Sequence, residues 1–126
     1  MHEQGGYPLP EELARHIRKG TFAPDELRGA CREAGEGLGQ EDAGEARFRS
    51  AAEMVALWRG LDLPAWIAPY ALRDARLGYL KGYEKALVSG ELTEAHIKRA
   101  ARARWGEGWR EKLERAARRW MRRDVC

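Results

Sequence analysis

The sequence predicts an all-α protein, a compact bundle of five or six short to medium helices. β-branched residues are scarce in the 126-residue chain, since Ile and Val together number six and Thr two, whereas proteins built from sheets are enriched in them. Ala and Arg, which both favour helices, number 20 and 18. Apolar residues also recur at helical intervals in several segments. The length fits a single domain over residues 1–126.

Proline and glycine mark the ends of the first two helices. Pro10 precedes two glutamates and Gly20 follows a basic last turn, which predicts a helix over residues 10–19. Pro24 stands at a first helical position and predicts a second helix over residues 24–34.

Three glycines at alternating positions predict a break after the second helix. They interrupt any helical period, so we expect residues 35–41 to form a flexible connection. Asp42 and Glu45 have the spacing of a capping box, and apolar residues recur at helical intervals up to Gly60. A third helix is therefore expected between Asp42 and Gly60.

A long amphipathic helix is expected in the second half of the chain. Pro64 and Pro69 bracket a short apolar segment, in which we expect one helical turn followed by a kink or restart. From Pro69 an apolar stripe continues at helical intervals and ends before Gly90.

Two Gly-Tyr pairs lie one helical turn apart within this long helix. Glycine inside a helix costs about 1 kcal/mol relative to alanine, so a local reason for Gly78 and Gly82 is expected. The favoured interpretation is close approach of a second helix to the glycine face. The alternative is a binding groove floored by glycine and walled by Tyr79 and Tyr83.

Two further helices are expected in the last third of the chain. Thr93 is a good cap for a helix that runs to Trp105, and glycines then mark a boundary before a final helix over residues 107–123. One apolar stripe of this helix consists of Trp109, Leu113, Ala116, Ala117 and Trp120. Tryptophans in such a stripe either pack in a core or stack on unpaired bases, and the shared stripe favours packing.

Positive charge is concentrated at the C-terminal end. Residues 1–90 carry 12 Lys and Arg against 14 Asp and Glu, whereas residues 91–126 carry 11 against 6. The basic helical segment at about residues 93–123 is therefore expected to attract a polyanion. The candidate nucleic-acid-binding residues are Lys98, Arg99, Arg102, Lys112, Arg115, Arg118, Arg119, Arg122 and Arg123.

A solvated helix face is the competing interpretation of this basic segment. Glu111 and Arg115, and likewise Glu114 and Arg118, have the spacing at which opposite charges neutralise each other on a helix. No acidic residue stands four positions before Lys112, Arg119, Arg122 or Arg123, so some positive charge is expected to stay free.

The sequence favours a non-enzymatic protein that binds the phosphate backbone of DNA or RNA. We expect it to be a small subunit of a larger nucleoprotein assembly that includes other protein subunits. In size, helical content and charge it resembles the small helical subunits that line nucleic acid inside ribonucleoprotein effectors, and small helical proteins of phages and mobile elements, without a shared motif. The alternative is a protein-interaction adaptor, of the kind that phages or mobile elements encode, whose basic residues only keep it soluble. A membrane-surface anchor ranks third, because the final helix is too rich in alanine to bury much apolar area.

Signals for catalysis, metals and cofactors are weak. Glu12 and His16 lie one turn apart, but no further ligand cluster has metal-site spacing, so a surface pair is expected. Neither Ser50 nor Ser89 lies in a nucleophile-elbow sequence. We expect no enzyme activity, no metal and no cofactor.

The chain has two cysteines, and Cys31 is expected to be inert in the core. So few cysteines do not predict a disulfide scaffold, and we expect no signal or membrane segment. These features favour a cytoplasmic protein.

Overall fold

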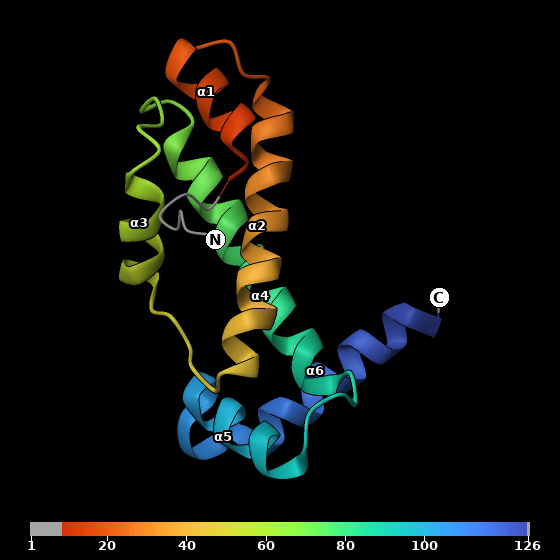
Figure 1. The fold of residues 1–126 in the computed structure, drawn as a ribbon. Helices are drawn as coiled ribbons and strands as arrows, with labels where there is room; N and C mark the ends of the chain where they lie inside the picture. The colour runs from red at the N-terminus through yellow and green to blue at the C-terminus, as the bar shows by residue number, and fades with distance from the viewer. Residues whose placement is uncertain (1–8, 126) are drawn as a thin grey trace.

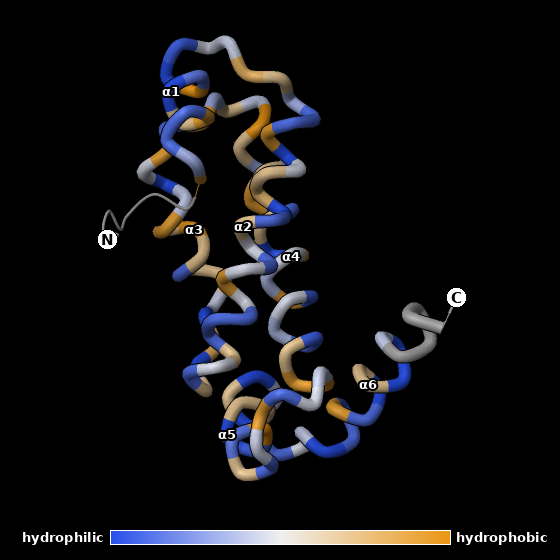
Figure 2. Tube along the Cα trace, turned by 45° about the vertical axis from the view of Figure 1, so that its right-hand side comes forward, coloured by the Kyte–Doolittle hydropathy of each residue, from blue (hydrophilic) through white to orange (hydrophobic). Residues whose placement is uncertain are grey.

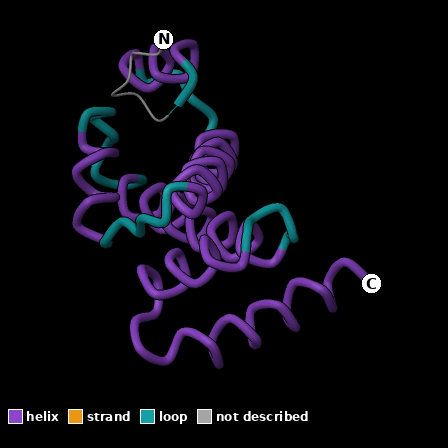
Figure 3. The backbone as a smooth tube through the Cα atoms, turned by 60° about the horizontal axis from the view of Figure 1, so that its bottom comes forward, coloured by secondary structure: helices purple, strands orange, loops and turns teal. Residues whose placement is uncertain are grey.

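The computed structural model describes residues 9–125, with side chains up to residue 120, and this part of the chain is helical without a strand (Figures 1 and 3). The all-α prediction is therefore confirmed. The helices are α1 (Glu11–Lys19), α2 (Pro24–Gly44), α3 (Ala51–Arg59), α4 (Ala68–Val88), α5 (Glu94–Trp105) and α6 (Trp109–Val125), with a 3₁₀ turn η1 (Gly106–Gly108) before α6.

The ends of most helices follow the local signals of the sequence. α1 ends at Gly20, which adopts a left-handed backbone with φ of 74°. Pro24 occupies the first turn of α2, and Thr93 caps α5 by accepting a hydrogen bond from the His96 N–H. These assignments agree with the sequence-based predictions.

The prediction of a flexible connection at residues 35–41 is wrong, because this segment lies inside α2. Asp42 is likewise an interior residue of α2 and not a cap. α3 begins instead after Ser50, whose side chain accepts from the Glu53 N–H while the Glu53 carboxylate accepts from the Ser50 N–H. The reason for the longer α2 lies in its contact with α4.

α2 and α4 run parallel and pack backbone against backbone (Figure 1). A Cβ atom at Gly35 would collide with the carbonyl oxygen of Ala75, and one at Gly39 with that of Tyr79. Gly78 and Gly82 present the same close approach to the backbone of α2. Close helix packing at the glycine face of α4 is thus confirmed, and the burial it creates outweighs the low helix propensity of the glycines in α2.

α3 lies on one side of the α2–α4 pair, as Figures 1 and 2 both show, and encloses the core there. Trp58 of α3 is fully buried and its indole N–H points to the sulfur of Cys31, 3.4 Å away. Burial raises the pKa of the Cys31 thiol, so this cysteine is the inert core residue that the sequence predicts.

α5 and α6 form a hairpin at one end of the α2–α4 pair (Figures 1 and 3). The Tyr83 hydroxyl of α4 donates to the carbonyl oxygen of Ala100 in α5 at 2.8 Å. Ala116 and Trp120 are buried against the other helices, which confirms packing for the apolar stripe of the final helix. The last turn of α6 extends away from the other helices (Figure 1).

Candidate nucleic-acid interface

The nine candidate residues all lie on the α5–α6 hairpin. Lys98, Arg99 and Arg102 are exposed on α5. Lys112, Arg115, Arg118 and Arg119 are exposed on α6. Arg122 and Arg123 also belong to α6, but their side chains are outside the described part of the structure.

Two of these candidates are engaged within the protein. Arg119 donates from Nη1 to the buried Glu84 carboxylate at 2.7 Å. Arg99 lies 3.1 Å from Nδ1 of His96, whose Nε2 lies 3.0 Å from the carbonyl oxygen of Ala43. Because an arginine only donates and a carbonyl only accepts, this arrangement matches the tautomer in which Nδ1 accepts from Arg99 and Nε2 donates to the Ala43 carbonyl. His96 is half-buried and joins α5 to the end of α2.

The other five described candidates form no ion pair within residues 9–120. They are Lys98, Arg102, Lys112, Arg115 and Arg118. The expected neutralisation of Arg115 by Glu111 and of Arg118 by Glu114 is also not seen among the described side chains. The hairpin therefore presents unpaired positive charge to solvent.

Basic side chains form a row along one flank of α6, and Arg119 of this row is the residue paired with Glu84. Lys112, Arg115 and Arg119 are three and four residues apart, so they follow each other on one side of the helix over about 10 Å. Arg122 continues the same spacing in the sequence. A row of this kind matches the repeated charges of a phosphate backbone.

A buried ion-pair cluster fixes α6 to α4. The Glu84 carboxylate of α4 accepts from Arg119 and from the indole N–H of Trp120 at 3.2 Å, and lies 3.5 Å from Arg104 of α5. The Arg104 guanidinium also lies over the rings of Phe48 and Trp105. Arg104 is therefore a structural residue that joins α5, α4 and the loop after α2.

Two more buried carboxylates have the same double-arginine arrangement, and sequence reasoning missed both. Asp74 of α4 accepts from Arg28 and Arg32 of α2, each at 2.7 Å. Burial alone would raise the pKa of Asp74, but the hydrogen bonds from these two arginines outweigh it and hold the pKa below its ordinary value. The helical spacing of Arg28 and Arg32 is visible in the sequence, but their partner lies more than forty residues away.

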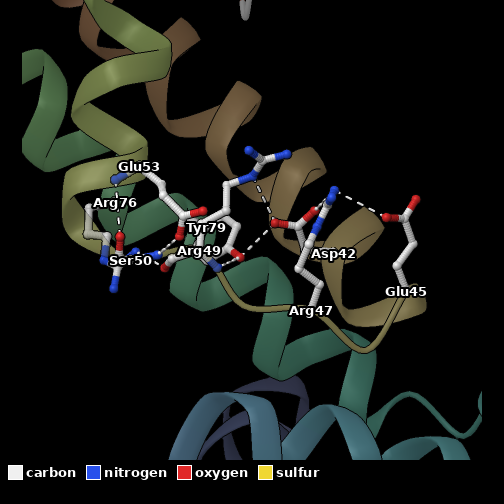
Figure 4. Close-up of polar contacts among 8 residues, drawn as sticks. All are labelled: Asp42, Glu45, Arg47, Arg49, Ser50, Glu53, Arg76 and Tyr79. Atoms are coloured by element: carbon white, nitrogen blue, oxygen red, sulfur yellow. Dashed lines mark hydrogen bonds and ion pairs between the residues drawn. The ribbon is translucent and has the colours of Figure 1, made fainter.

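Asp42 is the third buried carboxylate, and it replaces the cap that the sequence predicts there. Arg47 and Arg49 approach it from the loop after α2, at 3.0 and 2.9 Å, and the Tyr79 hydroxyl donates to it at 2.7 Å (Figure 4). The hydrogen bond and charge of Asp42 raise the pKa of Arg47. This cluster fixes the loop between α2 and α3.

The tyrosine-walled groove is contradicted by the structure. Tyr79 and Tyr83 are fully buried, and the glycines beside them are covered by α2. Burial raises the pKa of Tyr83 to about 12 and that of Tyr79 still further. Both side chains belong to the core.

Within the described residues, no group of three metal-ligating side chains lies together, and no helix there is long and apolar enough to cross a membrane. A surface hollow of about 490 Å³ opens between α4 and α6 beside the Glu84 cluster. A smaller hollow of about 220 Å³ lies over Asp74 between α2 and α4. Arg32 lines both hollows, so they adjoin each other.

We compared the chain with protein-family models, curated proteins and solved structures. No protein-family model, no curated protein and no solved structure matches this chain.

Proposed function

We propose that this protein is a non-enzymatic nucleic-acid-binding protein, a small subunit of a nucleoprotein assembly, that contacts the phosphate backbone through α5 and α6. The observation that carries the proposal is the set of five exposed cations on this hairpin without an ion pair among the described side chains. Arginine and lysine without an intramolecular partner are free to replace the counterions of a phosphate backbone.

The packing of the hairpin supports this proposal. Trp120 and Ala116 point into the protein, so the cations on the remaining surface of α6 face solvent. The helix backbone keeps the points from which these side chains extend at constant spacing.

A protein-interaction adaptor is the second candidate, because α4 and the turn before it expose large apolar side chains. Trp66, Tyr70 and Leu77 are all exposed. Exposed aromatic residues of this kind are typical of protein interfaces.

Salt dependence of binding separates the two candidates. Fluorescence anisotropy with labelled DNA and RNA is measured at several salt concentrations between about 50 and 200 mM. The triple variant Lys112→Gln, Arg115→Gln, Arg118→Gln should bind more weakly, and its slope of log affinity against log salt should be flatter by up to about 2 to 3, since each lost phosphate contact contributes about 0.7 to 0.9.

The matched control removes the same charge elsewhere. Arg15, Lys19 and Arg59 are exposed on α1 and α3, and their triple replacement by glutamine should leave the salt slope unchanged. Equal loss of affinity in both triple variants would show that only net charge matters. Absence of binding at low salt would remove the proposal and favour the adaptor.

A further inference from the structure

One flank of the α2–α4 pair carries features that the α5–α6 surface does not explain. Tyr70, Leu77 and Lys81 follow each other along this flank of α4, and the two adjoining hollows lie beside them. We propose that this flank binds a single strand of nucleic acid, with its phosphates on the arginines of the hollows and unpaired bases on the exposed rings. The inference rests on the proposed function and specifies the form of nucleic acid and its path.

The hollows are lined by more cations than anions. Their cations are Arg28, Arg32, Lys81, Arg104 and Arg119, and their carboxylates are Asp25, Asp74 and Glu84. The side chains of Asp74 and Glu84 are only 4% and 7% exposed, whereas their arginine partners Arg28, Arg32 and Arg119 are about half exposed. A ligand in the hollows therefore meets these arginines before it meets Asp74 or Glu84, whereas Asp25 is exposed at the edge of the smaller hollow.

The buried carboxylates also hold the arginines in place. Arg28 donates through Nε, Arg32 through Nη2 and Arg119 through Nη1. A guanidinium has five N–H donors, and the remaining donors of these three arginines have no acceptor among the described residues. Fixed arginines with unused donors are suited to phosphate oxygens.

Exposed aromatic rings continue the track beyond the hollows. Tyr70 is 52% exposed, and the Arg28 guanidinium lies 5.5 Å from its ring centroid. Trp66 is 60% exposed, with one face stacked on Phe22 at a centroid distance of 5.8 Å. From Ala68 to Lys81 the α4 helix advances by about 20 Å, and Tyr70, Leu77 and Lys81 share one of its faces by their spacing.

The alternation of rings and cations favours a single strand over a duplex. Ring faces bind base faces, and these are accessible only when the bases are unpaired. Arg119 lies both in the track and in the α6 row, so a strand that leaves the track at Arg119 continues along α6.

The test compares three labelled probes of about 15 nucleotides, oligo-dT, oligo-U and a DNA duplex, by anisotropy at low salt. The double variant Trp66→Leu, Tyr70→Leu keeps apolar side chains and removes both rings. Its ratio of single-strand to duplex affinity should fall at least about tenfold, because stacking on one ring contributes a factor of this order or more. Comparison of oligo-dT with oligo-U separates DNA from RNA.

Val55→Ala, a change at an exposed apolar residue of α3 outside the track, is the control, and circular dichroism verifies folding of each variant. An unchanged ratio in the double variant, or tighter binding of wild type to duplex, would overturn the single-strand track. If the α6 triple variant still weakens binding in that case, the proposed function stands without the track. If no probe binds at low salt, both proposals are wrong.

Discussion

Arginine has two roles in this chain, and individual contacts separate them. Asp42, Asp74 and Glu84 are buried carboxylates, and each is paired with two arginine side chains. An unpaired buried charge would be strongly destabilising, so these pairs are required by burial itself. Arg115 and Arg118, by contrast, have no such partner among the described residues. The charge of the sequence therefore overstates the charge that is free to bind a ligand.

The Asp74 pair predicts a dependence of stability on pH. Its arginines hold the pKa of Asp74 below the ordinary value. A carboxylate of this kind stabilises the folded state above the pKa of the unfolded chain, about 4, and the contribution is lost as the pH falls through the lower folded-state pKa. Asp74→Asn should lower the free energy of unfolding at neutral pH by about 1 to 3 kcal/mol and flatten its decline between about pH 5 and 2.

Urea unfolding across this pH range measures the effect. Glu33→Gln, at an exposed position of α2, is the control and should keep the wild-type pH profile. Parallel profiles for Asp74→Asn and wild type would contradict a stabilising role for the Asp74 carboxylate.

At the scale of elements, glycine spacing decides how α2 and α4 pack. Gly35 and Gly39 of α2 face the α4 backbone, and Gly78 and Gly82 of α4 face the α2 backbone. Residues four positions apart lie on one face of a helix, so each helix presents a continuous surface without side chains to the other. Gly37 lies between the first two but meets no atom within 4 Å.

Two neighbouring glycines should therefore respond to alanine with opposite signs. Gly35→Ala forces a Cβ atom into the backbone of α4 and should destabilise the protein by about 1 to 3 kcal/mol or more. Gly37→Ala has open space and should stabilise it by about 0.5 to 1 kcal/mol, because alanine favours the helix. Thermal unfolding of both variants is the measurement, and destabilisation by Gly37→Ala would contradict the helical assignment of residues 35–41.

At the scale of the whole molecule, the α5–α6 hairpin and the α2–α4 pair form one charged surface only because α6 is fixed to α4. Trp120 is buried, donates to Glu84 and lies under the ammonium group of Lys85. These contacts place Arg119 at the edge of the hollow between α4 and α6. Loss of this anchor should therefore affect both stability and the binding surface.

Two tryptophan variants test the anchor. Trp120→Ala should lower the free energy of unfolding by about 3 to 5 kcal/mol, because a large buried side chain is removed. Trp66→Ala removes an exposed tryptophan and should change it by less than about 1 kcal/mol. Chemical unfolding followed by circular dichroism gives both values. An unchanged melting temperature for Trp120→Ala together with lost self-association would instead favour the adaptor.

Local chemistry determined the parts of this protein that the sequence predicts correctly. Pro24 at a helix start, Gly20 after a helix end and the Thr93 cap act within a few residues, so the ends of α1 and α5 and the start of α2 follow from the sequence. The location of the basic segment and the apolar stripe ending at Trp120 also follow from it.

Only the tertiary structure decided the rest. Residues 35–41 are helical because the α4 backbone packs against Gly35 and Gly39, a contact that offsets their low helix propensity. Tertiary contacts also decide which charged side chains are paired. Asp74 meets Arg28 across 46 residues of chain, and which cations stay free depends on such pairs. Distant partners decide these features because burial makes the cost of an unpaired charge, or of a missing close contact, larger than any local preference.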